Sequence, residues 1–278
     1  MTITPDDVKS WQGAIGRSQS VTEVLEAGNL RRFAAAIGED MDVERAAPSM
    51  AHWAFFLPVA PDAEIGDDGH PRRGDFLPPI SLPRRMFAGA ALKFGAALKL
   101  GKPATRTSSI VSVNHKAGRS GDLVFVEVDQ IITQDGAMCV SERQSIVYRG
   151  EGEKAAPTPI VAKPHTQAAG DELWLPGPVN LFRFSAVTFN NHRIHYDAPY
   201  VTEVEGYPGL VVHGPFTAAK LLGHARKRLG KAPATFSFRA LAPLFVSQEV
   251  KLTVGETAES VAAIRCDGAV SMSATYTG

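Results

Sequence analysis

The segment that decides the fold is the stretch from Thr188 to Pro215. It opens with TFNNHRIHYD at residues 188–197 and closes with GYPGLVVHGP at residues 206–215. The first motif gathers polar side chains that can exchange protons, and the second places a short apolar run directly before Gly214. Proline suits the first turn of a helix, and glycine lets a ligand approach the backbone. We therefore expect a base beside a helix N-terminus, which suits chemistry at a carbonyl or thioester.

A helix and a set of strands follow this segment. Residues 216–229 carry apolar side chains near one helical face. Residues 235–241, 246–256 and 269–276 have strand composition, and Asp267-Gly268 is a turn signal before the last of them. The C-terminal half therefore predicts a helix followed by antiparallel strands.

The N-terminal half repeats this plan. Residues 49–57 are apolar nearly all round, which indicates a buried helix. Residues 107–114, 123–133 and 138–148 read as strands, and Asp135-Gly136 is a hairpin signal between the last two. The chain thus predicts an α+β fold in which a helix with an antiparallel sheet occurs twice.

The ends of the N-terminal half are more polar. Asn29 and Gly38 are suited to cap an exposed amphipathic helix between them. Residues 150–159 form a polar linker rich in proline and glycine. We accordingly place the boundary between the two halves at 150/151, giving units of residues 1–150 and 151–278.

A long loop, residues 58–83, precedes the first predicted strands and is punctuated by proline and glycine. Loops of that length in compact chains are usually functional. This one ends at Arg84 and Arg85, whose guanidinium groups could bind a carboxylate or phosphate. The alternative is that both arginines are simply solvated.

The composition limits the class of protein. Of the 278 residues 44% are apolar, and 29 basic residues balance 29 acidic ones. That balance gives no signature of binding to nucleic acid or to an anionic membrane. Cys139 and Cys266 are the only cysteines, and no apolar run approaches the ~20 residues of a membrane helix. The first residues are polar and acidic, unlike a secretory signal. We expect a cytoplasmic protein.

Three residues of the central segment could carry a reaction. His195 can accept a proton near neutral pH, and Asn190 could hold a water or a substrate oxygen beside it. The N–H of Gly214 could stabilise an oxyanion at the start of the helix. A base, an orienting amide and an oxyanion donor together suit an enolate intermediate, as in the addition of water to an unsaturated thioester.

Other chemistries fit this segment less well. His192, His195 and His213 could form a metal site with Asp197, but their spacing matches no familiar metal motif. Ser185 and Ser237 lack the setting of a hydrolase nucleophile, and no phosphate-binding glycine loop follows a strand. We expect neither a metal nor another resident cofactor.

The two central motifs resemble the active-site segment of the MaoC-like hydratases, whose fold is the double hot dog, with each sheet wrapped round a central helix. LPRRMFAG at residues 82–89 and KAGRSG at residues 116–121 narrow the resemblance. They are similar to the branch of mesaconyl-CoA (3-methylfumaryl-CoA) hydratases and mitochondrial-type 3-hydroxyacyl-thioester dehydratases.

The resemblance implies roles for individual residues. Gly214 matches the oxyanion glycine, whereas Asn190 stands where the broader pattern has an aspartate and His192 where it has an asparagine. His195 is then the principal acid and base, and its imidazolium also protonates the α-carbon. We expect the substrate to be bound by the remaining candidates: Arg84, Arg85, His192, Tyr196, Asp197, Val212 and His213.

The resemblance also implies a division of labour and a reaction. The N-terminal half, which has no comparable histidine motif, is expected to be non-catalytic and to shape the tunnel for the acyl-CoA substrate. The expected reaction is hydration of mesaconyl-CoA to citramalyl-CoA. The alternatives are a 3-hydroxyacyl-ACP or -CoA dehydratase of fatty-acid metabolism and a non-catalytic acyl-CoA-binding protein. Monomer and homodimer both remain open.

Overall fold

A computed structural model of the chain describes residues 3–118, 121–150 and 162–278. Arg119, Ser120 and the expected linker from residue 151 onward lie outside the described residues. The helices are α1 (Pro5–Gln12), α2 (Ala27–Ile37), α3 (Pro178–Thr188) and α4 (Gly214–Leu229), with short turns at η1 (Ala51–Ala54), η2 (Asp62–Glu64), η3 (Arg193–His195) and η4 (Tyr200–Val204).

The strands of the described residues form one ten-stranded sheet in which all neighbours are antiparallel. In the N-terminal half they are β1 (Ser18–Val24), β2 (Arg84–Phe94), β3 (Pro103–Gly118), β4 (Gly121–Gln134) and β5 (Ala137–Arg149). In the C-terminal half they are β6 (Glu172–Trp174), β7 (Thr235–Ala240), β8 (Val250–Val254), β9 (Ser260–Ile264) and β10 (Val270–Thr277). Their order across the sheet is β1-β3-β4-β5-β2-β7-β10-β9-β8-β6.

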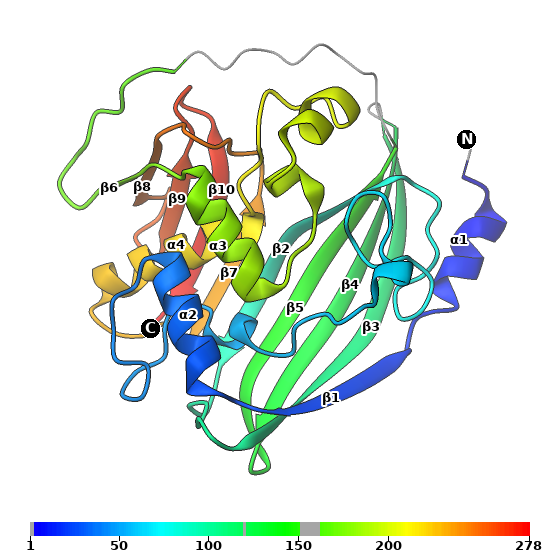
Figure 1. The fold of residues 1–278 in the computed structure, drawn as a ribbon, viewed down its shortest axis with the longest axis horizontal. Helices are drawn as coiled ribbons and strands as arrows, with labels where there is room; N and C mark the ends of the chain where they lie inside the picture. Colours follow the sequence, from blue (N-terminus) through cyan, green and yellow to red (C-terminus); the bar gives the residue numbers. More distant parts are fainter. Residues whose placement is uncertain (1–2, 119–120, 151–161) are drawn as a thin grey trace.

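The two halves join edge to edge. β2 pairs with β7 from Gly89 opposite Arg239 to Lys93 opposite Thr235. The sequence analysis expected two antiparallel sheets, one in each half, and the hydrogen bonds between β2 and β7 join them into one (Figure 1). The five strands of each half lie on their own side of that junction, so the duplicated plan survives within a single sheet.

Most strands lie where the sequence predicted them. β3, β4 and β5 contain the predicted strands of the first half, and β7, β8 and β10 correspond to those of the second. The hairpin at Asp135-Gly136 is confirmed, since both residues take the left-handed conformation with φ of 52° and 78°. β1, β2, β6 and β9 were not predicted, and β2 begins at Arg84, where the sequence analysis expected the end of a loop. β9 was missed because its first four residues are all buried and show no alternation.

The expectation for the first 57 residues was wrong in two ways. α2 is not a surface helix, since Leu30, Phe33 and Ile37 are buried in the core, and it begins at Ala27 rather than after Asn29. It does end at Gly38, as predicted, in the left-handed conformation. The predicted buried helix at 49–57 is only the short turn η1. α2 therefore belongs to the core of the protein.

The helices of both halves share one core. α2 packs against α3, and both lie on the same side of the sheet as α4 (Figure 1). The rings of Phe184 and Phe216 stack with centroids 4.8 Å apart, and Phe33 lies 6.1 Å from Phe184. Burial of each such ring stabilises the fold by about 1.5–3 kcal/mol. This shared core fixes α3 and α4, and the segment between them, against the N-terminal half.

None of the helices in the described ranges has both the length and the apolar character needed to cross a bilayer. Cys139 and Cys266 are buried free thiols.

Candidate active site

The two motifs of the central segment hydrogen-bond to each other. The Val211 N–H donates to the Ile194 carbonyl at 3.0 Å, and the Nδ1 atom of His195 lies 2.7 Å from the Val211 carbonyl oxygen. Gly214 is the first residue of α4, as predicted. These contacts bring His195 from η3 to the segment that leads directly into the helix N-terminus.

His195 is held in one tautomer. A carbonyl oxygen can only accept, so Nδ1 of the neutral ring must carry the proton and donate it to Val211. Nε2 then keeps its lone pair, and it has no hydrogen-bond partner among the described residues. His195 is only 7% exposed, and this burial lowers its pKa to about 3. The ring is thus a neutral imidazole with one free basic nitrogen.

His213 lies directly against His195. The two rings stack with centroids 3.6 Å apart and an interplanar angle of 19°. His213 is fully buried, its Nε2 lies 2.8 Å from Ser185 Oγ, and its Nδ1 has no partner among the described groups. His213 therefore supports His195 from within the core, in a position different from that expected of a substrate-binding residue.

Asn190 and His192 lie in the turn after α3. Phe189 ends α3 in the left-handed conformation (φ 48°), and Asn190 Oδ1 then accepts a hydrogen bond from the His192 N–H at 3.0 Å. The amide nitrogen of Asn190 remains available. The His192 ring meets His195 edge-on at 5.5 Å. Burial first, and then the neighbouring His70, lowers the pKa of His192 to about 3.

The N-terminus of α4 is open to a ligand. The first bond into this helix runs from the Thr217 N–H to the His213 carbonyl, and the Gly214 N–H has no partner among the described residues. A Cβ atom on Gly214 would have only the Phe87 carbonyl oxygen nearby, at 4.0 Å. The free N–H at a helix start is suited to hold a developing negative charge.

The long loop of the N-terminal half docks on residues 191–193 of the central segment. The carbonyls of Asp67 and Asp68 accept hydrogen bonds from the side chain and the backbone N–H of Arg193, both at 3.0 Å. Gly69 has a φ of +87°, and a Cβ on it would lie 2.0 Å from the Asn191 carbonyl oxygen. Only glycine fits this close approach.

The docked loop brings a further histidine into the site. His70 Nδ1 lies 3.1 Å from Asp68 Oδ2, and the His70 N–H donates to Oδ1 of the same carboxylate at 2.9 Å. The His70 ring lies 4.1 Å from that of His192. Burial opposes ionisation of Asp68, but the hydrogen bonds from His70 outweigh it and hold the Asp68 pKa well below its usual value.

The sequence analysis missed this Asp68–His70 pair and found no histidine motif in the N-terminal half. The available signal was Asp-Gly-His inside a loop already expected to be functional. The sequence did not indicate which segment this loop contacts, because that segment lies more than 120 positions further along the chain.

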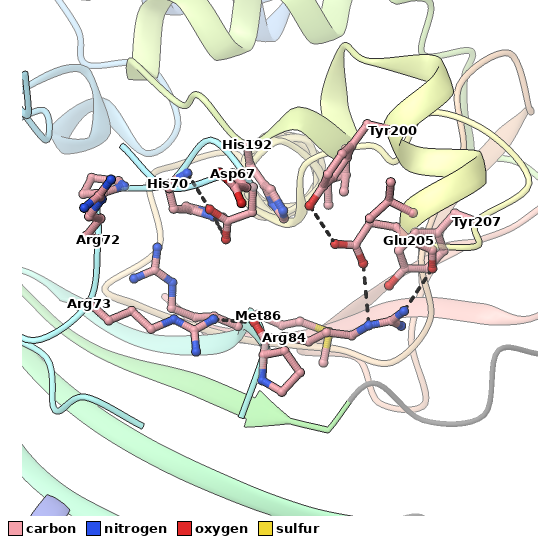
Figure 2. A pocket seen from close by; sticks show the side chains of 17 residues that line it. Asp67, His70, Arg72, Arg73, Arg84, Met86, His192, Tyr200, Glu205 and Tyr207 are labelled. Carbon is pink, nitrogen blue, oxygen red and sulfur yellow. Dashed lines mark hydrogen bonds and ion pairs between the residues drawn. The ribbon is translucent and has the colours of Figure 1, made fainter. Parts of the chain in front are cut away.

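Two cavities meet at the docked loop. The larger, of about 640 Å³, contains Arg72, Arg73, Arg84 and Arg85 and is reached by His192; we call it the arginine cavity (Figure 2). The smaller, of about 340 Å³, is lined mainly by aromatic and aliphatic side chains and by Asn190 and Pro215; we call it the apolar cavity. His70 lines both. Asn190 and the start of α4 thus face one cavity, and His192 faces the other.

The two arginines predicted to bind substrate differ in their surroundings. Arg84 forms an ion pair with Glu205 (Nε to Oε2, 3.6 Å) and donates to the Glu205 carbonyl at 3.1 Å (Figure 2). Tyr200 also donates to Glu205, at 3.3 Å. Arg85 lines the same cavity without an ion pair to any described residue. Arg85, like the exposed Arg72 of the same cavity, is therefore a cation available to an incoming anion.

Neither cavity is lined by the other candidates, which are Tyr196, Asp197, Val212, His213, Gly214 and the buried His195. Asp197 is bound to Arg193, with 2.7 Å between Oδ2 and Nη2, and also caps η4 through the Tyr200 N–H. Tyr196 is 52% exposed and donates to the Asn191 carbonyl, and Val212 is buried in the core. These residues hold the shape of the catalytic segment.

The metal set considered from the sequence does not assemble, because Asp197 is engaged by Arg193. A different set, Asp68, His70 and His192, has its ligand atoms within 4.8 Å of one another. Both oxygens of Asp68 accept hydrogen bonds from His70, however. The carboxylate therefore orients an imidazole in the structure described.

A duplicated helix-and-sheet fold with a neutral histidine beside an open helix N-terminus defines the class of double hot-dog thioester hydro-lyases. Solved structures agree with the fold. A MaoC-like dehydratase from Phytophthora capsici matches with a TM-score of 0.65 at 15% identity, over 97% of each chain. A Mycobacterium tuberculosis protein with a double hot-dog fold matches with a TM-score of 0.53 at 13% identity, over 94% of this chain and 95% of its own.

Sequence comparison gives the family. The profile of hydroxyacyl-thioester dehydratase type 2 matches residues 50–246. The mesaconyl-C4-CoA hydratase of Chloroflexus aurantiacus is 43% identical over 271 residues, which is 95% of this chain and 96% of that protein. The chain belongs to the hydroxyacyl-thioester dehydratase type 2 family, and it is a hydro-lyase acting on thioesters. The MaoC-like resemblance is thereby confirmed.

Proposed function

We propose that this enzyme hydrates the C4 thioester of mesaconate, 3-methylfumaryl-CoA, to citramalyl-CoA. The relative that is 43% identical carries this substrate in its name. The observation that carries the proposal is the fixed tautomer of His195, whose basic Nε2 is free while its Nδ1 is bound to Val211 at 2.7 Å. The uncommitted Arg85 supports the choice of a substrate with a second carboxylate.

The reaction runs through an enolate. His195 Nε2 takes a proton from a water molecule that the Asn190 side chain holds, and the resulting hydroxide adds to the β-carbon. The electrons of the double bond move to the thioester oxygen, which the Gly214 N–H stabilises at the positive end of α4. The His195 imidazolium then returns its proton to the α-carbon, so that one molecule of water has been added and the imidazole is again neutral.

The substrate itself constrains where its free carboxylate binds. In 3-methylfumaryl-CoA the carboxylate is attached directly to the β-carbon, the atom that water attacks. Its receptor must therefore lie next to the catalytic base. Arg85 meets this condition, because its charge acts on His192, whose ring contacts His195. Arg84 is neutralised by Glu205 and is assigned to supporting the cavity wall.

The test is an enoyl-thioester absorbance assay that compares mesaconyl-C4-CoA with crotonyl-CoA. We expect faster turnover of mesaconyl-C4-CoA, and a loss of about 10²–10⁴-fold in kcat for His195→Ala with an unchanged far-UV spectrum. Retention of full activity by that folded variant would remove His195 from the mechanism.

The second candidate is dehydration of 3-hydroxyacyl thioesters with a longer acyl chain. The apolar cavity favours it, since Trp53, Phe55 and Phe87 could receive an aliphatic chain. Faster turnover of crotonyl-CoA than of mesaconyl-C4-CoA would establish this alternative. Binding of both thioesters without turnover of either would leave a non-catalytic binding protein.

A further inference from the structure

His70 sits where the acyl end of a bound thioester must turn from one cavity into the other. It lines both the arginine cavity and the apolar cavity, on a loop that the N-terminal half supplies. Three of its neighbours are charged or titratable, and two of them come from other elements than its own loop. These two are Arg85 on β2 and His192 on the segment after α3, whereas Arg73 follows on the same loop, which also carries Asp68.

Asp68 fixes the tautomer of the His70 imidazole. The carboxylate accepts from Nδ1 at 3.1 Å and from the backbone N–H at 2.9 Å, so the imidazole must keep its Nδ1 proton. The other nitrogen, Nε2, has no hydrogen-bond partner among the described residues. It can become a donor only by taking up a second proton, and the adjacent carboxylate stabilises the imidazolium that results.

We propose that His70 binds the free carboxylate of the substrate, as an imidazolium held by Asp68 and together with Arg85. This inference rests on the proposed function, since it requires a substrate with a carboxylate on the β-carbon. In the occupied site the cations His70 and Arg85 face two anions, Asp68 and the substrate carboxylate, while Arg73 adds a further positive charge at the edge of the cavity. The proton that His70 gains at Nε2 comes from solvent on binding.

The charge balance explains why this proton is absent before binding. In the ligand-free protein burial lowers the pKa of His70, and the guanidinium of Arg85 lowers it further against the opposing hydrogen bond to Asp68. A carboxylate placed beside Arg85 removes that repulsion and adds an attraction. Binding of a dicarboxylic thioester therefore takes up a proton, whereas binding of a thioester without the carboxylate takes up none.

The same geometry places the binding sites for the thioester carbonyl and for the free carboxylate in different cavities. Asn190 and the start of α4 face the cavity in which the thioester carbonyl is placed, and Arg85 faces the other. His70 binds the free carboxylate, the group that distinguishes a branched dicarboxylic substrate from a simple fatty-acyl substrate. The N-terminal half then supplies substrate specificity to a catalytic segment that belongs to the C-terminal half.

The test measures the binding of two unreactive substrate analogues that differ only in the group proposed to bind His70, the carboxylate on the β-carbon. 3-Methylsuccinyl-CoA has the carboxylate on the β-carbon, and isovaleryl-CoA has a methyl group in its place. Calorimetric titrations of the wild type in two buffers of different ionisation enthalpy give both the Kd and the number of protons taken up. We expect the wild type to prefer 3-methylsuccinyl-CoA and to take up close to one proton with it alone.

His70→Gln keeps a polar side chain of similar reach but cannot become a cation. We expect it to weaken binding of 3-methylsuccinyl-CoA by roughly 10- to 100-fold, to change binding of isovaleryl-CoA by less than about 3-fold, and to abolish proton uptake. Asp68→Asn should act in the same direction by about tenfold. Asp75→Asn, an exposed carboxylate on the same loop outside both cavities, is the matched control and should change neither Kd.

The outcomes distinguish the inference from the proposed function. A wild type that binds isovaleryl-CoA as tightly as 3-methylsuccinyl-CoA would overturn the dicarboxylic substrate itself. A wild type that prefers 3-methylsuccinyl-CoA while His70→Gln keeps that preference would overturn the inference alone. Equal weakening of both analogues by His70→Gln would show a structural role for the loop, and stoichiometric zinc in the purified protein would show a metal site; either result also overturns it.

Discussion

The imidazoles of His195 and His213 lie face to face, with centroids 3.6 Å apart. Two protonated rings could not occupy this stack without strong repulsion, and neither ring has a carboxylate beside it among the described residues. Burial lowers the pKa of both, that of His195 to about 3. The stack therefore keeps the proposed base neutral across the physiological pH range.

The first prediction concerns stability against pH. A histidine whose pKa is lower in the folded than in the unfolded chain stabilises the fold fully above the unfolded pKa of ~6.5, and this stability is lost as the pH falls toward the folded pKa. For each such ring the loss is at most about 1.4 kcal/mol per pH unit. We expect the free energy of unfolding, measured with urea from pH 7.5 to 4.5, to decrease steeply below pH 6.5.

His213→Phe provides the comparison, because phenylalanine can stack on His195 but cannot titrate. Its free energy of unfolding should decrease less steeply with falling pH than that of the wild type. Parallel pH dependences of the two proteins would contradict the assignment of His213 as a buried neutral ring.

A second prediction concerns the pH dependence of catalysis. With the pKa of His195 at about 3, the base is deprotonated over the whole range in which the protein is folded. The acid limb of kcat/KM should therefore lie well below pH 6.5, the position expected for an exposed histidine. The measurement is an initial-rate profile restricted to pH values at which circular dichroism shows the native fold. An acid limb centred near pH 6.5 would assign the titration to another group.

The third prediction concerns the docked loop. Gly69→Ala would put a Cβ atom 2.0 Å from the Asn191 carbonyl oxygen, so the loop must move away from the catalytic motif. We expect a fall of at least about tenfold in kcat/KM, because misplacing groups in a site by an ångström commonly costs more than that.

Gly101→Ala is the matched control for that variant. Gly101 also has a positive φ, of +72°, but a Cβ there would meet nothing within 4 Å. It should lower the free energy of unfolding by about 1 kcal/mol through backbone strain and leave kcat/KM unchanged. Equal kinetic effects of the two substitutions would show that docking of the loop does not matter for catalysis.

The fourth prediction separates the two neighbouring arginines. Arg85→Gln should raise KM for mesaconyl-C4-CoA by roughly 10- to 100-fold, since a charged hydrogen bond contributes about 1.5–3 kcal/mol. Arg84→Gln leaves the mostly buried Glu205 without its cation and should chiefly lower the melting temperature. Initial rates with both substrates and thermal unfolding of both variants decide the assignment. A larger KM effect for Arg84→Gln would reverse it.

Local sequence patterns were sufficient for the elements whose signals are local. The start of α4 at Gly214, the hairpin at Asp135-Gly136 and the end of α2 at Gly38 all depend on residues a few positions apart. The resemblance identified the family, and comparison with known proteins confirmed it.

The parts that could not be predicted depend on contacts between distant residues. The pairing of β2 with β7, the position of α2 in the core and the docking of Gly69 on Asn191 each join segments far apart in the sequence. The difference between Arg84 and Arg85 has the same origin, because only the fold reveals that Glu205 lies beside one and not the other. Roles assigned to His195, Asn190 and Gly214 remain predictions that the kinetic experiments test.

The edge-to-edge pairing of β2 with β7 has a consequence for how the site responds to dilution. Asp68 and His70 come from one half of the chain and His195 from the other, yet a covalent connection and a common sheet hold them together. Their encounter is intramolecular, so its effective concentration is set by the fold and not by the amount of protein. Dilution of the protein therefore does not separate Asp68 and His70 from His195.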